Sequence, residues 1–132
     1  MSEPKKDSAP AKKILVVDDD AALLQMIQKI LSEVGEVKCA NDGLEAINLI
    51  QAGYLPDIVI TDVMMPRVDG IKLCQQIKKM PQTVNVPVIM LTAKGQPKDV
   101  ITGINAGVRY YLTKPFKTAD LVAKVKKTLC IT

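Results

Sequence analysis

The stretch Ile14-Leu15-Val16-Val17-Asp18-Asp19-Asp20 runs from four aliphatic residues directly into three acidic ones. An unbroken aliphatic run of this length is typical of a strand that is covered on both faces, as in a parallel sheet. In such folds, ligands bind outside the carboxyl ends of the strands, which is where the acidic triplet follows. The stretch therefore predicts an α/β protein with a polar site at one edge of its sheet.

The rest of the chain alternates between short apolar runs and amphipathic segments. Further strands are predicted at 37–40, 58–60, 86–91 and 108–112, and helices at 23–34, 44–50, 71–78, 98–105 and 119–129. Five strands that alternate with five helices on short connections imply a doubly wound parallel sheet with helices on both faces. We expect residues 1–12 to be a disordered basic tail and residues 13–130 to form one domain.

The composition is that of a single globular domain. The 132 residues are 48% hydrophobic and 24% charged, and no apolar run approaches the roughly 18 residues of a membrane span. The first 13 residues lack the apolar stretch of a secretory signal. We therefore expect a cytoplasmic protein that does not contact a membrane.

The net charge of +4 comes from the two ends of the chain. Residues 1–13 hold four lysines and two acids, and residues 114–132 hold five lysines and one aspartate. The body between them, residues 14–113, holds nine basic and eleven acidic residues. A terminal excess of this kind is more often a solvated surface than a nucleic-acid site, so we expect no direct contact with nucleic acid.

The chain contains no histidine. This excludes Ser-His and Cys-His nucleophile pairs, histidine-ligated zinc, and a role as a carrier of phosphohistidine. The three cysteines, Cys39, Cys74 and Cys130, are far apart and form no CxxC spacing, so neither a metal cage nor a redox pair is indicated. We interpret them as small buried thiols in a reducing cytosol.

Chemically matched residues stand at four predicted strand ends: Asp18 and Asp19, Asp62, Thr92 and Lys114. Parallel strands bring these residues to one edge of the sheet, where the carboxylates would repel one another. A hard divalent cation such as Mg²⁺, which prefers oxygen ligands, relieves that repulsion. An ammonium and a hydroxyl at the same edge suit a phosphoryl group.

Each of these residues alone also fits a structural role. The acidic triplet is equally consistent with a solvated loop whose last member, Asp20, caps the following helix. Thr92 and Lys114 taken singly are ordinary loop and surface residues. The joint placement at four strand ends favours the functional interpretation. Nucleotide binding lacks support, because neither GxGxxG nor GxxxxGK[ST] occurs.

Four segments in order resemble the motifs of the response-regulator receiver domain, the CheY-like partner of sensor histidine kinases. They are Ile14–Asp20, Asp62–Gly70, Leu91–Ala93 and Tyr111–Phe116, and the likeness extends over about residues 13–130. The resemblance implies a flavodoxin-like fold with strand order 2-1-3-4-5. It also implies a signalling switch that is phosphorylated by a sensor histidine kinase or a histidine phosphotransfer protein and acts on a downstream protein target without enzymatic turnover.

The resemblance implies a role for each matching residue at the acidic edge. Asp62 would be the phosphoacceptor. Asp18 and Asp19 would hold Mg²⁺, together with a carboxylate oxygen of Asp62 and the backbone carbonyl of Met64. Lys114 would pair with the phosphoryl oxygens, which neutralises charge during transfer.

Two further residues would convert phosphorylation into a change of shape. Thr92 would hydrogen-bond the phosphoryl group and draw its loop inward, and Tyr111 would move into the vacated space. The peptide bond between Lys114 and Pro115 is expected to be cis, as in the family.

Two alternatives come from other functional classes. A pseudo-receiver would use the same fold as a binding module without phosphorylation, but such proteins usually lose a pocket residue that this chain keeps. A hydrolase of the haloacid dehalogenase type needs a second acid two residues after the nucleophile, where Met64 stands.

The sequence departs from the family in one region. Receiver domains usually carry acidic residues just before the aromatic of the fifth strand, where this chain has Arg109 and Tyr110. We therefore expect no symmetric dimer through the fourth helix, fifth strand and fifth helix. The chain ends at Thr132, which fits both a stand-alone receiver and a piece of a longer regulator.

Overall fold

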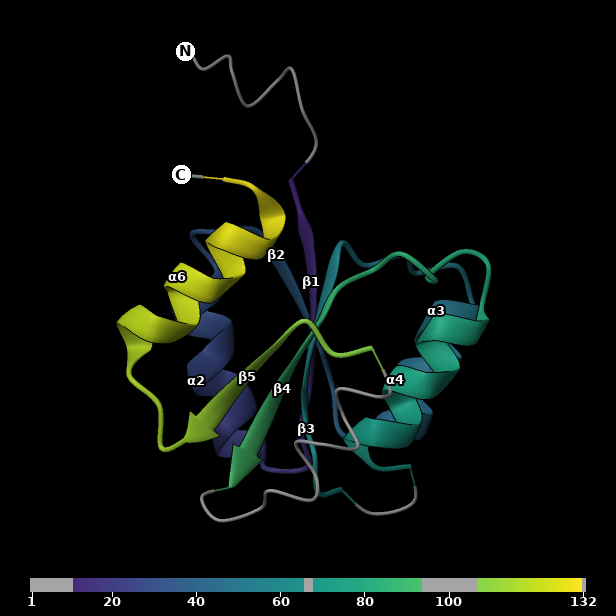
Figure 1. Cartoon of the computed structure of the whole chain (residues 1–132). Helices are drawn as coiled ribbons and strands as arrows, with labels where there is room; N and C mark the ends of the chain where they lie inside the picture. Colours follow the sequence, from purple (N-terminus) through teal and green to yellow (C-terminus); the bar gives the residue numbers. More distant parts are fainter. Residues whose placement is uncertain (1–10, 66–67, 94–106, 132) are drawn as a thin grey trace.

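The computed structural model describes residues 11–65, 68–93 and 107–131, which fold around a five-stranded parallel sheet (Figure 1). The strand order is β2-β1-β3-β4-β5, so the predicted order 2-1-3-4-5 and the flavodoxin-like class are confirmed. The strands are β1 (Lys13–Val17), β2 (Glu36–Ala40), β3 (Ile58–Asp62), β4 (Val88–Ala93) and β5 (Tyr110–Lys114).

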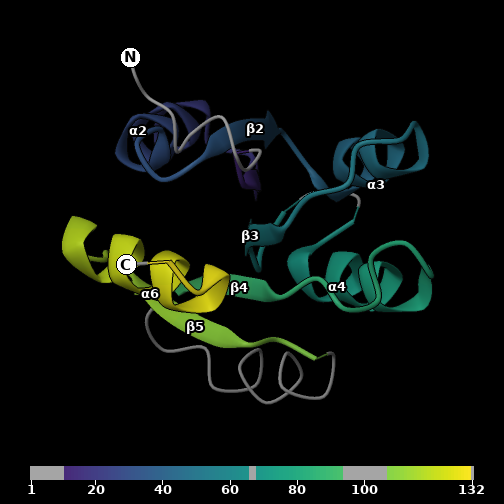
Figure 2. The same cartoon turned by 90° about the horizontal axis from the view of Figure 1, so that it is seen from above.

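Helices cover both faces of the sheet. They are α2 (Ala21–Leu31), α3 (Gly43–Gln51), α4 (Gly70–Lys79) and α6 (Thr118–Leu129). Seen from above, α2 and α6 lie on one face, and α3 and α4 lie on the other (Figure 2). The helix expected at 98–105 and the tail expected at 1–12 fall outside the described residues, apart from Ala11 and Lys12. Among the described helices, none has the length and apolar character needed to cross a bilayer.

The aliphatic run of β1 divides the core between the two faces. Ile14 and Val16 pack towards α2 and α6, whereas Leu15 and Val17 pack towards α3 and α4. All four side chains are fully buried. Because successive side chains of a strand point to opposite faces, a strand buried on both sides needs apolar residues at every position.

Three helices begin with an aspartate cap. Asp20, Asp42 and Asp69 each accept hydrogen bonds from backbone N–H groups in the first turns of α2, α3 and α4. Such caps satisfy amides that have no partner within the helix. Asp20 and Asp69 follow β1 and β3, so they fix the start of the helices that leave the acidic edge.

Some element boundaries differ from the sequence prediction. Helix α2 ends at Leu31 rather than Val34, because the N–H groups of Val34 and Gly35 both turn back to the Leu31 carbonyl, at 2.9 and 3.2 Å. Strands β4 and β5 begin two residues later than predicted. The N–H of Val86 closes a turn onto the Thr83 carbonyl at 3.0 Å, which takes Val86 out of the sheet.

The cysteines occupy three environments. Cys74 is buried, Cys39 is half-buried and Cys130 is exposed. The interpretation as buried thiols is therefore right for Cys74 and wrong for Cys130. Cys130 follows the last turn of α6 in the left-handed conformation, with φ of 60°, where the chain leaves the core.

Candidate functional site

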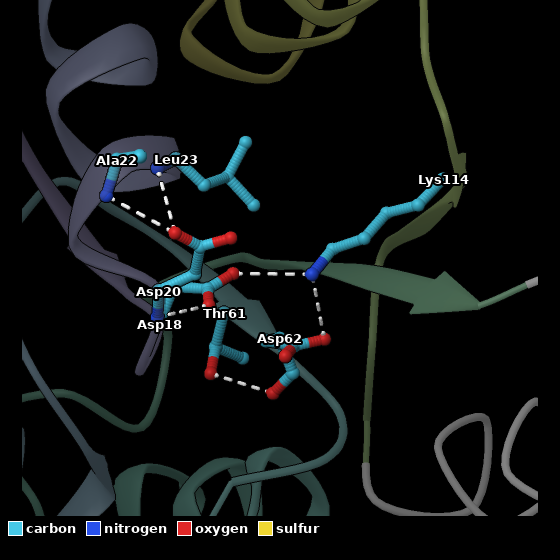
Figure 3. A network of polar contacts seen from close by, with 7 residues as sticks. All are labelled: Asp18, Asp20, Ala22, Leu23, Thr61, Asp62 and Lys114. Carbon is cyan, nitrogen blue, oxygen red and sulfur yellow. Dashed lines mark hydrogen bonds and ion pairs between the residues drawn. The ribbon is translucent and has the colours of Figure 1, made fainter.

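The carboxyl ends of the central strands meet at the lower edge of the sheet in Figure 1. Asp18 directly follows β1, Asp62 is the last residue of β3, and Lys114 is the last residue of β5. Figure 3 shows Lys114 reaching across this edge towards the two carboxylates. The parallel topology thus brings together residues that are up to 96 positions apart in the chain.

Lys114 bridges the two carboxylates. Its Nζ lies 3.2 Å from Oδ2 of Asp18 and 3.2 Å from Oδ1 of Asp62. Asp18 is 0% exposed and Asp62 is 8% exposed, so both pairs are shielded from water. Charge-assisted contacts of this kind are stronger in a shielded site than on an open surface.

The three aspartates of the acidic triplet have different contacts and different exposure. The Asp18 Oδ1 atom accepts a hydrogen bond from the N–H of Asp20 at 2.9 Å, which orients the buried carboxylate. The Asp20 Oδ1 atom accepts from the N–H groups of Ala22 and Leu23, at 3.0 and 3.2 Å, and caps α2. Asp19 is exposed. The capping interpretation is therefore right for Asp20, and Asp18 and Asp19 remain candidates for the predicted site.

Three carboxylates are placed to share one cation. Asp18, Asp19 and Asp62 each offer an oxygen, and these oxygens lie within 4.8 Å of one another. Mg²⁺ binds oxygen at about 2.0–2.1 Å, so ligands on opposite sides of the ion stand roughly 4.2 Å apart. The donor set, all carboxylate oxygen, fits a hard divalent ion and lacks the nitrogen or sulfur that softer metals favour.

The electrostatics of the cluster also favour a bound cation. Burial raises the pKa of Asp18 and of Asp62 above their ordinary value of 3.8, although hydrogen bonds and the charge of Lys114 counter part of this effect. Burial lowers the pKa of Lys114, but the attraction of the two carboxylates outweighs it, so the pKa is raised. Lys114 stays charged at neutral pH, and the carboxylates still outnumber it.

These shifts predict an unusual pH dependence of stability. A carboxyl whose pKa is raised by folding stabilises the folded state when it is protonated. Its contribution to the free energy of unfolding is therefore largest below pH 3.8 and falls as the pH rises through the raised pKa. Lys114 titrates far above this range and adds no slope there. Without divalent ions, we expect the free energy of unfolding to fall as the pH rises above about 4 and through the raised pKa values of the two carboxyls.

Urea unfolding from pH 4 to 8, with Mg²⁺ or with EDTA, measures this effect. The stabilisation by Mg²⁺ should grow as the pH rises, and it should shrink in an Asp18→Asn variant, which lacks one of the charges. A Mg²⁺ effect that is constant with pH would contradict the electrostatic account.

Thr92 lies near the end of β4 and Met64 just after β3, near the same edge, whereas Tyr111 lies further back on β5, three residues before Lys114. Thr92 is buried near the end of β4, one residue beyond Leu91, the β4 partner of Asp62 in the parallel register. Tyr111 is half-buried on β5 and packs against the core on the side of α3 and α4. Met64 is 59% exposed, two residues after Asp62. The peptide bond between Lys114 and Pro115 is cis, as expected.

Gly70 also shapes the site, and the sequence did not predict this role. Its N–H donates to the carbonyl of Val63 at 2.9 Å, which seats the start of α4 against the end of β3. A Cβ atom at this position would overlap the backbone carbonyl oxygen of Asp62. The only sequence signal is the Asp69-Gly70 pair, which indicates a helix start but not what the helix presses against.

If Asp62 accepts a phosphoryl group, as the resemblance implies, Gly70→Ala should slow its labelling by about tenfold or more, because a displacement of roughly 1 Å at a reacting group can cost 10²-fold. The matched control is Gly35→Ala, where a Cβ atom would overlap the carbonyl of Lys12 at the opposite end of the sheet. Both variants should lose about 1–3 kcal/mol of stability from overpacking. Equal labelling rates for the two folded variants would contradict a positioning role for Gly70.

An apolar hollow lies beside Lys114. Its volume is about 480 Å³ and it is lined by Leu23, Met26, Lys114, Pro115 and Phe116, from α2 and the connection between β5 and α6. Met26 is 45% exposed at its rim. Exposed apolar side chains grouped beside a reactive site are typical of a surface that receives another protein.

Comparison with known proteins decides the family. The sequence model of the response regulator receiver domain matches residues 14–126. The chain belongs to the response-regulator receiver family. A Chloroflexus aurantiacus chain assigned as a response regulator is 40% identical, with a TM-score of 0.85, over 92% of this chain and 99% of that one. The chemotaxis protein CheY4 of Vibrio cholerae is 31% identical, with a TM-score of 0.83, over 89% and 98% of the two chains.

Longer proteins match as well. The "Probable transcriptional regulator ycf27" of Guillardia theta is 42% identical over 124 residues, which are 93% of this chain and 47% of that protein. The receiver chain thus spans about half the length of the curated relatives that it matches.

Membership places the site in a known class. Receiver domains of two-component systems are phosphorylation switches rather than turnover enzymes, and they generally bind Mg²⁺ in an acidic pocket. They interact with histidine kinases and with downstream targets. The acidic cluster beside Lys114 is where this chain offers such a pocket.

Proposed function

We propose that Asp62 accepts a phosphoryl group from the phosphohistidine of a sensor histidine kinase or a histidine phosphotransfer protein, and that the modified domain signals by contact with another protein. The observation that carries this proposal is the bridge of Lys114 between Asp18 and Asp62. The three side chains supply a nucleophile, metal ligands and a phosphoryl-binding cation at one edge of the sheet. These 132 residues contain no histidine, so the phosphohistidine must lie outside them.

Each residue has a distinct part in the transfer. A carboxylate oxygen of Asp62 forms a bond to phosphorus while the bond from phosphorus to the donor's imidazole nitrogen breaks. Asp18, Asp19, Asp62 and the backbone carbonyl of Met64 would hold Mg²⁺, which supplies charge neutralisation. Lys114 pairs with the phosphoryl oxygens, and this positioning provides most of the catalysis in phosphoryl transfer.

Thr92 and Tyr111 form the switch in this proposal. The phosphoryl group adds about 1.5–2 negative charges and three acceptor oxygens, to which the Thr92 hydroxyl donates a hydrogen bond. Tyr111 then moves deeper into the space beside β4. Hydrolysis of the aspartyl phosphate by water ends the signal slowly, without a turnover cycle. We assign this unit to residues 13–130, in the cytoplasm, with residues 1–12 as a basic tail.

Incubation with acetyl phosphate tests the function directly. We expect intact-protein mass spectrometry to show the gain of one phosphoryl group that requires Mg²⁺ and disappears with EDTA. No gain, combined with no Mg²⁺ binding, would favour the pseudo-receiver, a binding module that works without phosphorylation.

The hollow beside Lys114 is the surface that we propose for the protein phosphodonor. We predict that Met26→Lys slows transfer from a phosphorylated histidine phosphotransfer protein by about tenfold, because it places a charge in an apolar contact. Labelling by acetyl phosphate, which is too small to need the hollow, should stay within about twofold of the wild type. Equal slowing with both donors would place the effect at the reaction site instead.

A further inference from the structure

Thr61 is a buried hydroxyl residue directly before the proposed phosphoacceptor. It is 0% exposed, and its Oγ1 atom donates a hydrogen bond to the backbone carbonyl of Asp62 at 3.0 Å (Figure 3). On the same strand, Val59 and Val63 pack towards α3 and α4. Because side chains alternate along a strand, Thr61 lies on their face of β3 and the Asp62 side chain lies on the other. Thr61 therefore contacts Asp62 through the main chain and not through the carboxylate.

The peptide group between Asp62 and Val63 is held on both sides. Its carbonyl accepts from the Thr61 hydroxyl, and its N–H donates to the carbonyl of Leu91 on β4 at 3.1 Å. The start of α4 lies against the same carbonyl, which a Cβ atom at Gly70 would overlap. Thr61 is shielded from bulk water, so the loss of its hydroxyl would leave the carbonyl without this donor.

The orientation of this peptide group bears on the carboxylate that reacts. Asp62 is the last residue of β3, so the chain leaves the regular sheet directly after it. A rotation of the following peptide turns the Cα atom of Asp62, and the carboxylate moves with it. The 3.2 Å contact between Oδ1 of Asp62 and Nζ of Lys114 would change as well. Phosphoryl transfer depends mainly on the positions of the reacting groups, so a small displacement here slows the reaction.

We propose that Thr61 is a positioning residue for the phosphorylation of Asp62. Its hydroxyl holds the peptide group between Asp62 and Val63 in the orientation that aims the carboxylate at the phosphodonor. The inference rests on the proposed function and deepens it, because it names a residue behind the acidic edge that sets the rate. In the competing interpretation, the carbonyl only satisfies a buried hydroxyl, and the rate does not depend on it.

Thr61→Val separates the two interpretations, because it removes the hydroxyl and keeps the shape of the side chain. In saturating Mg²⁺, we expect the maximal rate of labelling by acetyl phosphate to fall about fivefold. The acetyl phosphate concentration that gives half of this rate should stay within about twofold of the wild type, as for a loss confined to the transition state. The ion pairs of Lys114, which would bind the incoming phosphoryl group, do not involve Thr61. Thr61→Ser keeps the donor and should restore the maximal rate to within about twofold.

Thr83→Val is the matched control. Thr83 is also 0% exposed, and its Oγ1 atom donates to the carbonyl of Ile77 at 2.8 Å. It lies in the connection from α4 to β4, which enters the sheet at the edge opposite the carboxylates. The control loses the same buried hydrogen bond but should keep the maximal rate within about twofold. Urea unfolding shows that each variant is folded under the labelling conditions.

Three results would overturn the inference. They are an unchanged maximal rate in Thr61→Val, equal slowing in Thr61→Val and Thr83→Val, and slowing in Thr61→Ser as large as in Thr61→Val. If Thr61→Val does not fold, Thr61→Ala, which also lacks the hydroxyl, takes its place with the same expectations. A wild type that is not labelled would overturn the proposed function and this inference together. A labelled wild type with an unchanged Thr61→Val rate would overturn this inference alone.

Discussion

The Asp62→Asn variant is expected to take up no phosphoryl group from acetyl phosphate, even at saturating Mg²⁺. The amide keeps the shape of the side chain but removes the anionic oxygen that attacks phosphorus. Lys114 then keeps only one of its two ion pairs, the one with Asp18 at 3.2 Å. Intact-protein mass spectrometry measures the loss, which should be complete within detection.

The fold should survive this substitution. Burial raises the pKa of Asp62, which means that the folded protein holds its charge at a cost. The free energy of unfolding should therefore be equal or higher in the variant. Asp57→Asn is the matched control, since the Asp57 carboxylate accepts from the N–H of Lys13 at the other end of the sheet and should not affect labelling. Undiminished labelling of Asp62→Asn would move the acceptor to another carboxylate.

The fold and the location of the site could be predicted because both depend on local patterns. The run Ile14–Val17 is fully buried on both faces, as its lack of alternation predicts. Once the strands are parallel, their carboxyl ends share an edge by topology alone. The convergence of Asp18, Asp62 and Lys114 therefore follows from the strand assignments, without any knowledge of the side-chain contacts.

Other features depend on packing that no local pattern encodes. The end of α2 at Leu31 depends on a tight turn, because Val34 continues the apolar periodicity beyond the helix. The contact of Gly70 with the Asp62 carbonyl joins the start of a helix to the end of a strand eight residues earlier in the chain. The hollow beside Lys114 combines side chains from α2 and from the segment before α6. Each of these features can be identified only once the three-dimensional arrangement of the chain is known.

The Lys114→Ala variant is expected to accept the phosphoryl group but to lose nearly all of the resulting change in β5. Mg²⁺ and the acidic cluster still hold the reacting groups, so labelling continues, although more slowly. Lys114 is the last residue of β5 and the only cation that joins this strand to Asp18 and Asp62 among the described ion pairs. Without Lys114, β5 has no cationic side chain that could pair with a phosphoryl group on Asp62.

Amide chemical shifts of Tyr111 and Leu112, recorded before and after phosphorylation, measure this coupling. Lys117→Ala is the matched control, because Lys117 is exposed just before α6 and its side chain forms no cap. The control should keep both labelling and the shift changes. A Lys114→Ala protein that is labelled and still shows the full shift changes would assign the coupling to Thr92 alone. The geometry argues against that outcome, since Lys114 contacts both carboxylates before any phosphoryl group arrives.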